Sequence, residues 1–587
     1  MLDAITAEII RQRLLAVPEL IDRNVTRTAF SPLIADYKDY AVGIVDAQGR
    51  LIAQCKGGIT VFVANALGTA VLDGLALYGA SRIEPGDVLI TNHAGTMGQH
   101  LNNVVMYTPI HVGPQQELFG FMALVFHWMD VGGAIVGSCV SNTTTDIYQE
   151  GIQFRSVKLV KRGEPAEDIY RMIEYNTRFP EMVLGDVQAQ LAGCLKGRDM
   201  VVEIIARYGL SPVRETIENM WDQSERIARK AIAAIPDGTY EASSYLDDDG
   251  IRSGLRIPVK VRVEILGDEL TVDFSEVADQ LPGPLNSGRQ GGAVAAARIA
   301  CKYLLTPDEP ANEGAFRPLK VRIPDGKFLS AAPDAPMGGS GSTLPTGIDT
   351  ILRAVAQAAP GSVNAGHHGT FGIHMFHGRA PSSGEIFKHG NTAIGGWGAS
   401  PEGDGEGPFR SMIHADTFEM PIEMQEALFP CRIESFSLRT DSGGAGTYRG
   451  GLGIERVYAP TAPVSLAASF DRTACPPWGL AGGSEGLPGF VEIRPATDSA
   501  PVHLTKGNQS LAPGDTVVVR TGGGGGWGPA AGREVESVVA DVRAGYVSAA
   551  AAASTYGVIF SRGLLVDEER TAAARKALQQ RSEKAPE

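Results

Sequence analysis

The residues best suited to chemistry in this chain lie between positions 91 and 133. His100 follows a glycine and a glutamine, and His127 ends an apolar, strand-like run. If the chain between the two histidines runs out and back as two extended segments, both histidines lie at the same end and can converge on a single point. Neutral imidazole is the commonest protein ligand for a catalytic transition metal. The spacing therefore indicates a candidate metal site.

The alternative is that His100 and His127 are core residues whose ring nitrogens hydrogen-bond to the backbone. The spacing is not a compact motif such as H-E-x-x-H, in which helix geometry brings the ligands together. On these two residues alone the core interpretation is the stronger one. A pattern elsewhere in the chain is needed to favour a metal.

Four blocks of sequence supply that pattern, and together they span nearly the whole chain. They are residues 6–14 with 27–32 and 38–41, residues 100–133, residues 439–453, and residues 475–480 with the glycine run at 522 and the tail 540–548. The third block reads R-T-D-S-G-G-A-G-T-Y-R-G-G-L-G, which is too long and too unusual in composition for a chance match. The blocks resemble the hydantoinase B and oxoprolinase family, which includes the beta subunits of N-methylhydantoinases and ATP-dependent lactamases and the large subunits of acetone and acetophenone carboxylases.

The resemblance implies which residues bind the metal. The segment 100–133 is similar to the family's G-G-T-H-L-P-D-V and A-H-x-A-D-x-G-G, which places the metal ligands on His100 and His127. The carboxylate of H-L-P-D falls on Asn103, whose amide is neutral, so we expect weaker metal affinity unless another carboxylate joins. Asp39, which matches the Asp of the family's R-D-F block, is the first candidate and Asp130 the second. We expect Asn103 to contact substrate, and whether it also remains a ligand stays open.

The resemblance also implies a division of labour between two polypeptides. A hydantoinase A-like, ATP-binding partner phosphorylates an amide or enol oxygen, and the hydantoinase B-like chain holds one divalent transition metal, here zinc, manganese or iron. An unstrained amide has a poorly electrophilic carbon and a poor leaving group, and O-phosphorylation removes both barriers. The metal can then polarise the activated group, or lower the pKa of a bound water to about 7.

Two further residues have a predicted role in the site. Asp130 is a candidate general base, or a group that holds an imidazole in the correct tautomer. A carboxylate that caps the turn at Gly132 and Gly133 is an equally good interpretation. His414 falls where family members also have histidine, so we expect it to contact substrate or the partner chain.

Other histidines and glycines invite functional interpretations that we do not adopt. The histidines between 367 and 389 alternate with glycines, which indicates strand and loop lining satisfied by backbone or substrate groups. The glycine runs at 443 and 522–526 are not followed by Lys-Ser/Thr, and no G-x-x-x-x-G-K-[ST] occurs in the sequence. We predict that these glycines form β-turns and contacts between chains, and that ATP is bound by a separate polypeptide.

Composition excludes several classes of protein. The net charge of −15 and the absence of a basic patch argue against a nucleic-acid partner. Six scattered cysteines without a C-x-x-C pair argue against a disulfide framework and favour a reducing compartment. Apolar runs are too short for a membrane span, and the N-terminus lacks the features of a signal peptide. We therefore expect a cytoplasmic protein that acts on a small-molecule substrate, with no membrane or nucleic-acid partner.

Length and pattern predict an α+β fold of several subdomains with large mixed β-sheets. The 587 residues exceed what one hydrophobic core normally supports. We expect an N-terminal helix at 3–29, strands at 104–112 and 118–127, and two helices within 184–235. The predicted domains are 1–235 with the metal site, a central α/β region at 236–430, and a glycine-rich β region with a short helical tail at 431–587.

Three functions compete at this point. The first is ATP-dependent hydrolysis of a cyclic amide or hydantoin, completed on this chain. The second is ATP-dependent carboxylation of a ketone, for which the chain is short beside typical acetone carboxylase large subunits. The third is a non-catalytic scaffold subunit whose metal site has decayed, which Asn103 alone supports.

Overall fold

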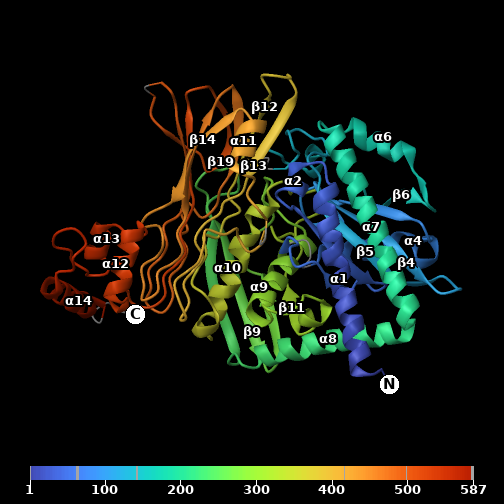
Figure 1. The fold of residues 1–587 in the computed structure, drawn as a ribbon, viewed down its shortest axis with the longest axis horizontal. Coiled ribbons are helices and arrows are strands. Elements are labelled where there is room, and N and C mark those ends of the chain that lie inside the picture. Colours follow the sequence, from blue (N-terminus) through green and yellow to red (C-terminus); the bar gives the residue numbers. More distant parts are fainter. Residues whose placement is uncertain (1, 61–64, 140–142, 415–416, 498, 583–587) are drawn as a thin grey trace. The chain divides into compact units, whose positions relative to one another are not determined.

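The computed structural model describes residues 2–60, 65–139, 143–414, 417–497 and 499–582. The chain folds into two compact units (Figure 1). One contains Met1–Ser243, Asp248–Ile351 and Met412–Pro421, and the other contains Ser244–Asp247, Leu352–Ser411 and Ile422–Glu587. Neither predicted domain boundary, 235/236 or 430/431, coincides with a division between the units, because each unit is assembled from segments far apart in the sequence.

A seven-stranded antiparallel sheet forms the centre of the first unit. The strand order is β2-β1-β5-β4-β3-β6-β7, and every neighbouring pair is antiparallel. The long hairpin predicted from the sequence is present as β4 and β5, whose residues are almost all buried. The strands are β1 (Tyr40–Asp46), β2 (Leu51–Gln54), β3 (Val88–Thr91), β4 (Asn103–Val112), β5 (Glu117–His127), β6 (Val157–Lys161) and β7 (Glu164–Pro165).

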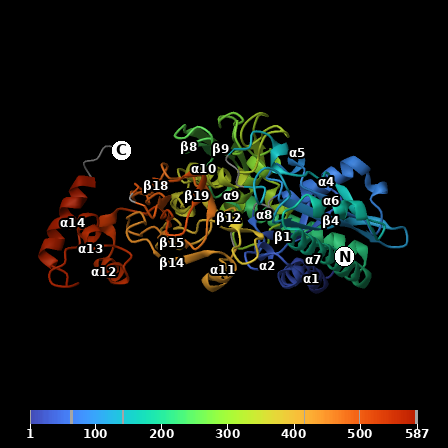
Figure 2. The ribbon, with the colours of Figure 1, turned by 90° about the horizontal axis from the view of Figure 1, so that it is seen from above.

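Helices cover both faces of this sheet (Figure 2). On one face α7 (Pro180–Tyr208) approaches β5 so closely that a Cβ at Gly197 would lie 2.6 Å from Met122. On the other face α4 (Ala66–Tyr78) lies against Tyr107 of β4, which also contacts Phe121. Since side chains alternate along a strand, His127 has the same orientation as Phe121 and lies on the α4 face.

The N-terminal helix α1 (Ala4–Thr28) packs with α7 on the first of these faces. Asp3 caps it by accepting a hydrogen bond from the Thr6 N–H at 3.0 Å. Its buried stripe is Ile10, Leu14, Val17, Ile21 and Val25. Two apolar positions of the predicted pattern, Ile5 and Ile9, are instead exposed, at 75% and 42%.

The remaining helices of this unit match the sequence pattern closely. The predicted break in the region 184–235 occurs at Gly209, whose φ of +87° ends α7 before α8 (Leu210–Ile232) begins. Shorter helices include α2 (Pro32–Ala35), α5 (Ala94–Met97), η2 (Ile147–Glu150), α6 (Glu167–Tyr175), η3 (Gln290–Val294), α9 (Ala295–Leu305), η5 (Ser340–Ser342) and α10 (Leu344–Val355), of which α10 continues into the second unit.

A second sheet follows α8 in the sequence. Its order is β11-β10-β9-β8, and β10 pairs with β11 in parallel, which makes it a mixed sheet. The strong alternation of buried and exposed residues along β9 is that of a half-buried strand. The strands are β8 (Gly238–Leu246), β9 (Ile257–Leu266), β10 (Glu269–Asp273) and β11 (Leu319–Arg322).

The second unit is built on two antiparallel sheets. Their orders are β13-β12-β16-β19 and β14-β15-β20-β17-β18, and aromatic residues such as Phe376, Tyr458 and Phe470 fill the core beside them. The strands are β12 (Ile373–Arg379), β13 (Ile386–Asn391), β14 (Cys431–Leu438), β15 (Ile454–Pro460), β16 (Val464–Ser469), β17 (Phe490–Arg494), β18 (Val502–His503), β19 (Lys506–Leu511) and β20 (Thr516–Arg520). The helices are α11 (Ile422–Leu428), α12 (Val535–Ala544), α13 (Ala549–Ser554) and α14 (Glu568–Ser582).

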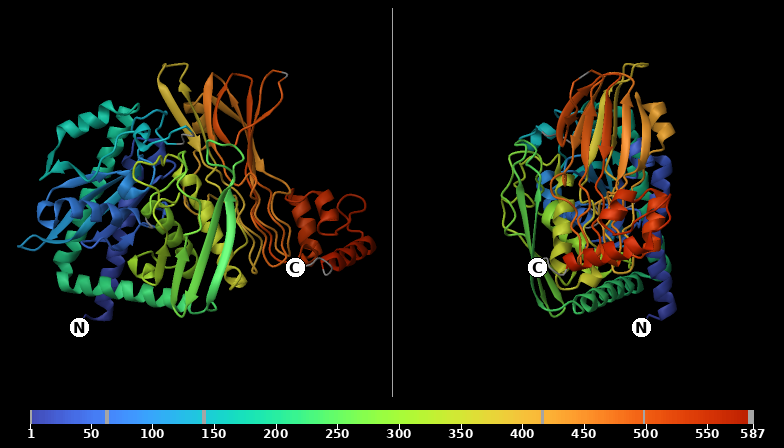
Figure 3. Two further views of the ribbon diagram at one scale, coloured as in Figure 1. Left: turned by 180° about the vertical axis from the view of Figure 1, so that it is seen from behind. Right: turned by 90° about the vertical axis from the view of Figure 1, so that its left-hand side faces the viewer.

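Four glycine-rich stretches of this unit, 395–407, 442–453, 479–487 and 522–528, run side by side as extended chain without forming regular strands (Figure 3). We call them the glycine-packed segments. Gly524 N–H donates to the Gly451 carbonyl at 2.9 Å, and a Cβ on Gly524 would overlap the carbonyl group of Trp397. The prediction of β-turns at Gly522–526 is wrong, because this stretch contains no turn and its N–H groups donate to carbonyls of distant segments. Absent side chains here permit close backbone packing instead.

The fold is therefore α+β, as predicted. In the described part of the chain, no helix combines the length and the apolar character needed to cross a bilayer. All six cysteines are buried, and none of them forms a disulfide within the described residues.

Candidate functional site

The structure brings His100 and His127 together. The antiparallel register pairs Asn103, the first residue of β4, with His127, the last residue of β5, so both strands end at the same place. The two imidazole rings have centroids 5.0 Å apart and planes inclined by 56°. His127 is buried and His100 half-buried.

The side chain of Asn103 lies beside these rings. Its Nδ2 donates to Gln99 Oε1 at 2.9 Å and lies 3.4 Å from His100 Nε2. Its Oδ1, fully buried, has no hydrogen-bond partner among the residues that the structure describes. A buried acceptor without a donor costs free energy. The amide oxygen is therefore an atom that a cation or a substrate N–H would satisfy.

Asp39 reaches the site through the edge of β1. His127 N–H donates to the Asp39 carbonyl at 3.0 Å, because β1 pairs with β5. The preceding residue, Lys38, has a φ of +65°, a conformation that side-chain-bearing residues rarely adopt. The following residue, Tyr40, is fixed by a hydrogen bond of 2.7 Å from its hydroxyl to Asp22 of α1. The backbone around Asp39 is thus held tightly on both sides.

His414 belongs to the segment Met412–Pro421, which is part of the first unit. Phe418 N–H donates to the Tyr37 carbonyl at 3.1 Å, and the His414 and Tyr37 rings are 6.4 Å apart in an edge-on arrangement. His414 therefore lies beside the short stretch of chain that leads into Asp39.

Asp130 has the contacts of a residue that organises a loop. Its carboxylate accepts hydrogen bonds from the N–H groups of Gly132 and Gly137, from the Ser138 hydroxyl, and from the backbone and guanidinium of Arg178, the last at 2.8 Å. The side chain is fully buried. These contacts match the turn-capping alternative, since both carboxylate oxygens are already occupied by donors.

The loop that Asp130 organises carries Cys139 back to His127. Gly132, Gly133, Gly137 and Ser138 all have positive φ, which reverses the chain direction within a few residues. Asn102 secures the loop because its Nδ2 donates to the carbonyls of Trp128 and Gly137 at 2.8 and 3.1 Å. Cys139 Sγ then lies 3.6 Å from His127 Nε2. Cys139 was not among the predicted site residues, because a lone thiol twelve residues after a histidine is a weak signal.

Glu150 stabilises the wall beside His100. The His100 N–H donates to Ser340 Oγ at 3.3 Å. Glu150 accepts the N–H groups of Met337 and Gly338, at 3.2 and 2.8 Å, and so holds the turn that contains Ser340. Burial of this carboxyl raises its pKa to about 7.

The donors around His127 can be compared with the needs of a divalent ion. In the described ranges no three His, Cys, Asp or Glu side chains already converge as a metal cluster. The two imidazoles have a suitable spacing, because rings that share one ion at about 2.1 Å from each nitrogen have centroids roughly 5 Å apart. The donor types fit, with two imidazoles and a buried amide oxygen, and ion binding requires one further donor to approach the rings.

Three buried histidines of the second unit are engaged with polar partners, as predicted. The Nε2 atoms of His368, His374 and His389 lie 3.0 to 3.1 Å from the Phe409 carbonyl, the Tyr458 hydroxyl and the Gln425 amide oxygen. Burial lowers the pKa of His368 and of His374 to about 3, so both rings are neutral. This arrangement favours a structural role.

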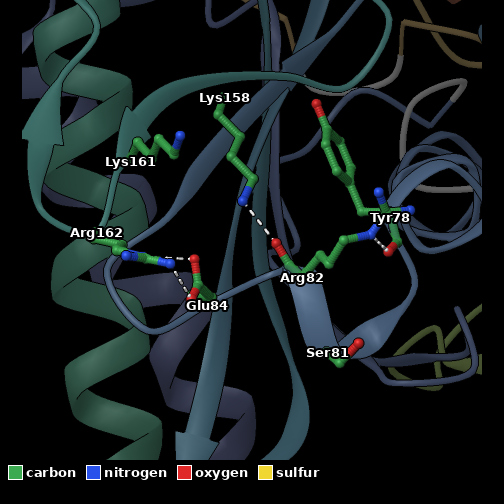
Figure 4. A pocket seen from close by; sticks show the side chains of 7 residues that line it. All are labelled: Tyr78, Ser81, Arg82, Glu84, Lys158, Lys161 and Arg162. Atoms are coloured by element: carbon green, nitrogen blue, oxygen red, sulfur yellow. Dashed lines mark hydrogen bonds and ion pairs between the residues drawn. The ribbon is translucent and has the colours of Figure 1, made fainter.

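A separate cavity of about 510 Å³ opens near the start of β3, whereas the candidate site lies beyond the end of that strand (Figure 4). Two of its basic side chains are paired with carboxylates: Arg162 with Glu84 at 2.6 Å, and Lys158 with Asp87 at 2.6 Å. The cavity is lined by Tyr78, Ser81, Arg82, Glu84, Lys158, Lys161 and Arg162. With neither imidazole nor thiol in this lining, the histidine pair remains the better candidate for catalysis.

Comparison with known proteins identifies the family to which a chain with this fold and this site belongs. The chain belongs to the hydantoinase B/oxoprolinase family, whose model matches residues 3–530. It is 28% identical to the B component of a putative D-/L-hydantoinase of Pseudomonas sp. (strain NS671), over 98% of each chain. It is 29% identical to the caprolactamase beta subunit of Pseudomonas jessenii, over 98% of this chain and 99% of the other.

Solved structures agree with this membership. The ATP-dependent caprolactamase from Pseudomonas jessenii matches with a TM-score of 0.89 and 27% identity, over 98% of this chain and 100% of that one. The nucleotide-free structure of acetone carboxylase matches with a TM-score of 0.88 over 100% of this chain and 84% of that one. At 19% identity the second match shows a shared fold.

Proposed function

We propose that this chain is the metal-holding component of an ATP-dependent enzyme that opens cyclic amides. A hydantoinase A-like partner uses ATP to phosphorylate the amide oxygen, and this chain completes the hydrolysis. The observation that carries the proposal is the His100–His127 pair at the paired ends of β4 and β5. The names of the relatives, a hydantoinase component and a caprolactamase beta subunit, supply the substrate class.

Each residue of the site has a role in this proposal. His100, His127 and Asp39 hold one divalent ion, either zinc, manganese or iron. When bound, the ion supplies Lewis acidity to the activated carbon–oxygen group. Asn103 and His414 contact the substrate, and the unsatisfied Asn103 Oδ1 accepts an N–H from it. Asp130 positions the loop next to His127 and transfers no proton.

A separate ATP-binding partner is supported by the sequence. The glycine runs that superficially suggest phosphate binding are instead extended and packed against other backbone. The sequence has no G-x-x-x-x-G-K-[ST] motif. Both features support the proposal that the amide is phosphorylated on another polypeptide.

The proposal is tested by reconstitution with a hydantoinase A-like partner. ATP hydrolysis and ring opening are measured on a panel of hydantoin, 5-oxoproline and caprolactam, together with the metal content of this chain. We expect coupled ATP and amide hydrolysis, and loss of both bound metal and ring opening in His127→Ala. Full activity and unchanged metal content in His127→Ala would show that the assignment is wrong.

Two other outcomes assign the competing functions. ATP turnover that depends on bicarbonate in the same complex indicates ketone carboxylation. Acetone carboxylase, whose fold this chain shares, is named for a reaction of this kind. Purified chain that binds no divalent metal, and whose His127→Ala variant supports full activity of the complex, indicates a scaffold role.

A further inference from the structure

We propose that Cys139 is the anionic ligand that completes the metal site of this chain and compensates for the amide at Asn103. The inference rests on the proposed function, because it assumes that His100 and His127 hold an ion. It adds one thiolate to the two imidazoles and the Asp39 carboxylate of that proposal, which makes a zinc-type donor set.

The distance between Cys139 and His127 is the first argument. A tetrahedral ion with sulfur at about 2.3 Å and nitrogen at about 2.1 Å places these two donors about 3.6 Å apart. Cys139 Sγ and His127 Nε2 are 3.6 Å apart. The His100 ring lies at a spacing from His127 that also suits one shared ion. Cys139 and His100 therefore each lie at a distance from His127 that two ligands of one ion would have.

Charge is the second argument. His100, His127 and Asn103 are neutral donors and Asp39 supplies one negative charge, so a second anion is needed to compensate a divalent ion. A coordinating thiol loses its proton, here to solvent, and contributes a full negative charge at the ion. The buried Asn103 Oδ1, which lacks a hydrogen-bond partner in the described part of the chain, is a neutral acceptor near His100 that a cation can satisfy.

The construction of the loop is the third argument. The buried Asp130–Arg178 ion pair, the amide of Asn102 and the positive φ values before Cys139 all fix the loop that carries the thiol. The other cysteine close to β4 has a different environment, since Cys194 Sγ donates to the Met106 carbonyl at 3.4 Å. Cys194 is thus a matched control for Cys139.

Loading requires a small rearrangement. The described side chains form no ready-made cluster of three donors, so binding must draw Cys139 and His100 around His127. A soft thiolate in the set favours zinc over manganese, which prefers oxygen donors.

X-ray absorption of the zinc-loaded, full-length chain tests the assignment without relying on activity. We expect a sulfur shell at about 2.3 Å in addition to nitrogen and oxygen at about 2.0 Å. Cys139→Ser should lose this shell and bind zinc at least roughly tenfold more weakly. Cys194→Ser should retain both the shell and the affinity.

A rescue variant separates ligation from folding. Adding Asn103→Asp to Cys139→Ser introduces a carboxylate beside His100, and zinc affinity should return without the sulfur shell. Zinc bound by the native chain through nitrogen and oxygen alone would overturn the role of Cys139 and leave the proposed function standing. A native chain that binds no divalent metal would overturn both.

Discussion

At the scale of single residues, Asp130 shows how one carboxylate can organise a loop. The sequence equally favoured a catalytic base and a turn cap, because both need a carboxylate shortly after His127. The donors around Asp130 favour the turn cap, and they include Arg178 from a segment almost fifty residues away. The spacing of residues near Asp130 in the sequence does not show that a hydrogen-bond donor from a distant segment contacts its carboxylate.

Asp130→Asn should destabilise the protein by about 3 kcal/mol. The side-chain NH2 of asparagine would face N–H donors that now bind a carboxylate oxygen, and Arg178 would lose its anionic partner. Urea denaturation measures this change. Asp168→Asn, at a side chain that is 90% exposed and paired with Arg171, should alter stability by no more than about 0.5 kcal/mol. A variant that loses activity and retains native stability would instead favour the general-base role.

Glu150 predicts a specific pH dependence. Its pKa in the folded protein is about 7, against an ordinary value of 4.5, so the folded state binds the proton more tightly. The stability contributed by this group is therefore fully present below pH 4.5 and is lost as the pH rises to 7, by at most about 3 kcal/mol. In Glu150→Gln this loss should disappear, which thermal unfolding between pH 4.5 and 7.5 measures.

The exposed Glu203→Gln variant is the control for this measurement, because it should follow the pH profile of the native chain. Parallel profiles for the native chain and Glu150→Gln would contradict the raised pKa. The side chain of Glu150 was not identified from the sequence, since nothing in the run 147–150 shows that it accepts the N–H groups of Met337 and Gly338.

At the scale of elements, periodicity predicted much of what positions the site. The apolar runs 104–112 and 118–127 predicted β4 and β5, and the register of this hairpin places Asn103 opposite His127. Because turn geometry and alternation fix such a register, the convergence of the two histidines was predictable. The approach of Cys139 was not, since it depends on positive φ values at Gly137 and Ser138.

The glycine-packed segments have no periodicity from which their structure could be predicted. Glycine carries no side chain to show which face is buried, so turns and extended chain look alike in the sequence. Their arrangement becomes visible only through hydrogen bonds between segments, such as Gly444 N–H to the Gly524 carbonyl at 2.8 Å.

Gly524→Ala should prevent these segments from packing, because its Cβ would overlap the Trp397 carbonyl group. We expect loss of several kcal/mol, comparable to overpacking of a core, or failure to obtain folded protein. Gly403→Ala lies in the same region, where a Cβ meets nothing within 4 Å, and should be tolerated. Equal melting temperatures for both variants in differential scanning calorimetry would contradict the close packing.

At the scale of the whole molecule, the two units are interleaved along the chain. The first unit needs Asp248–Ile351 and Met412–Pro421 in addition to the N-terminal region. The short segment contributes hydrogen bonds such as that of 2.6 Å from the Thr60 hydroxyl to the Met412 carbonyl. Changes in composition along the sequence do not show that a later segment folds back into the first unit. The predicted domain boundaries therefore differ from the divisions between the two units.

A fragment of residues 1–243 should therefore not fold independently. It retains the seven-stranded sheet but lacks two segments of its unit, so we expect a broad, non-cooperative thermal transition where the full chain unfolds sharply. Circular dichroism of both proteins measures the difference. A sharp transition in the fragment would show that the N-terminal region is self-sufficient.

The glycine-packed segments also have a thermodynamic consequence. They expose little hydrocarbon when they separate, so their opening should carry a small heat-capacity increment, unlike that of the aromatic core around Phe376. Backbone amides such as that of Gly524 should then keep their hydrogen-exchange protection at low temperature, where the hydrophobic stabilisation from buried apolar side chains weakens. Hydrogen-exchange protection factors compared between 5 and 35 °C would reveal two populations of amides whose protection changes in opposite directions with temperature.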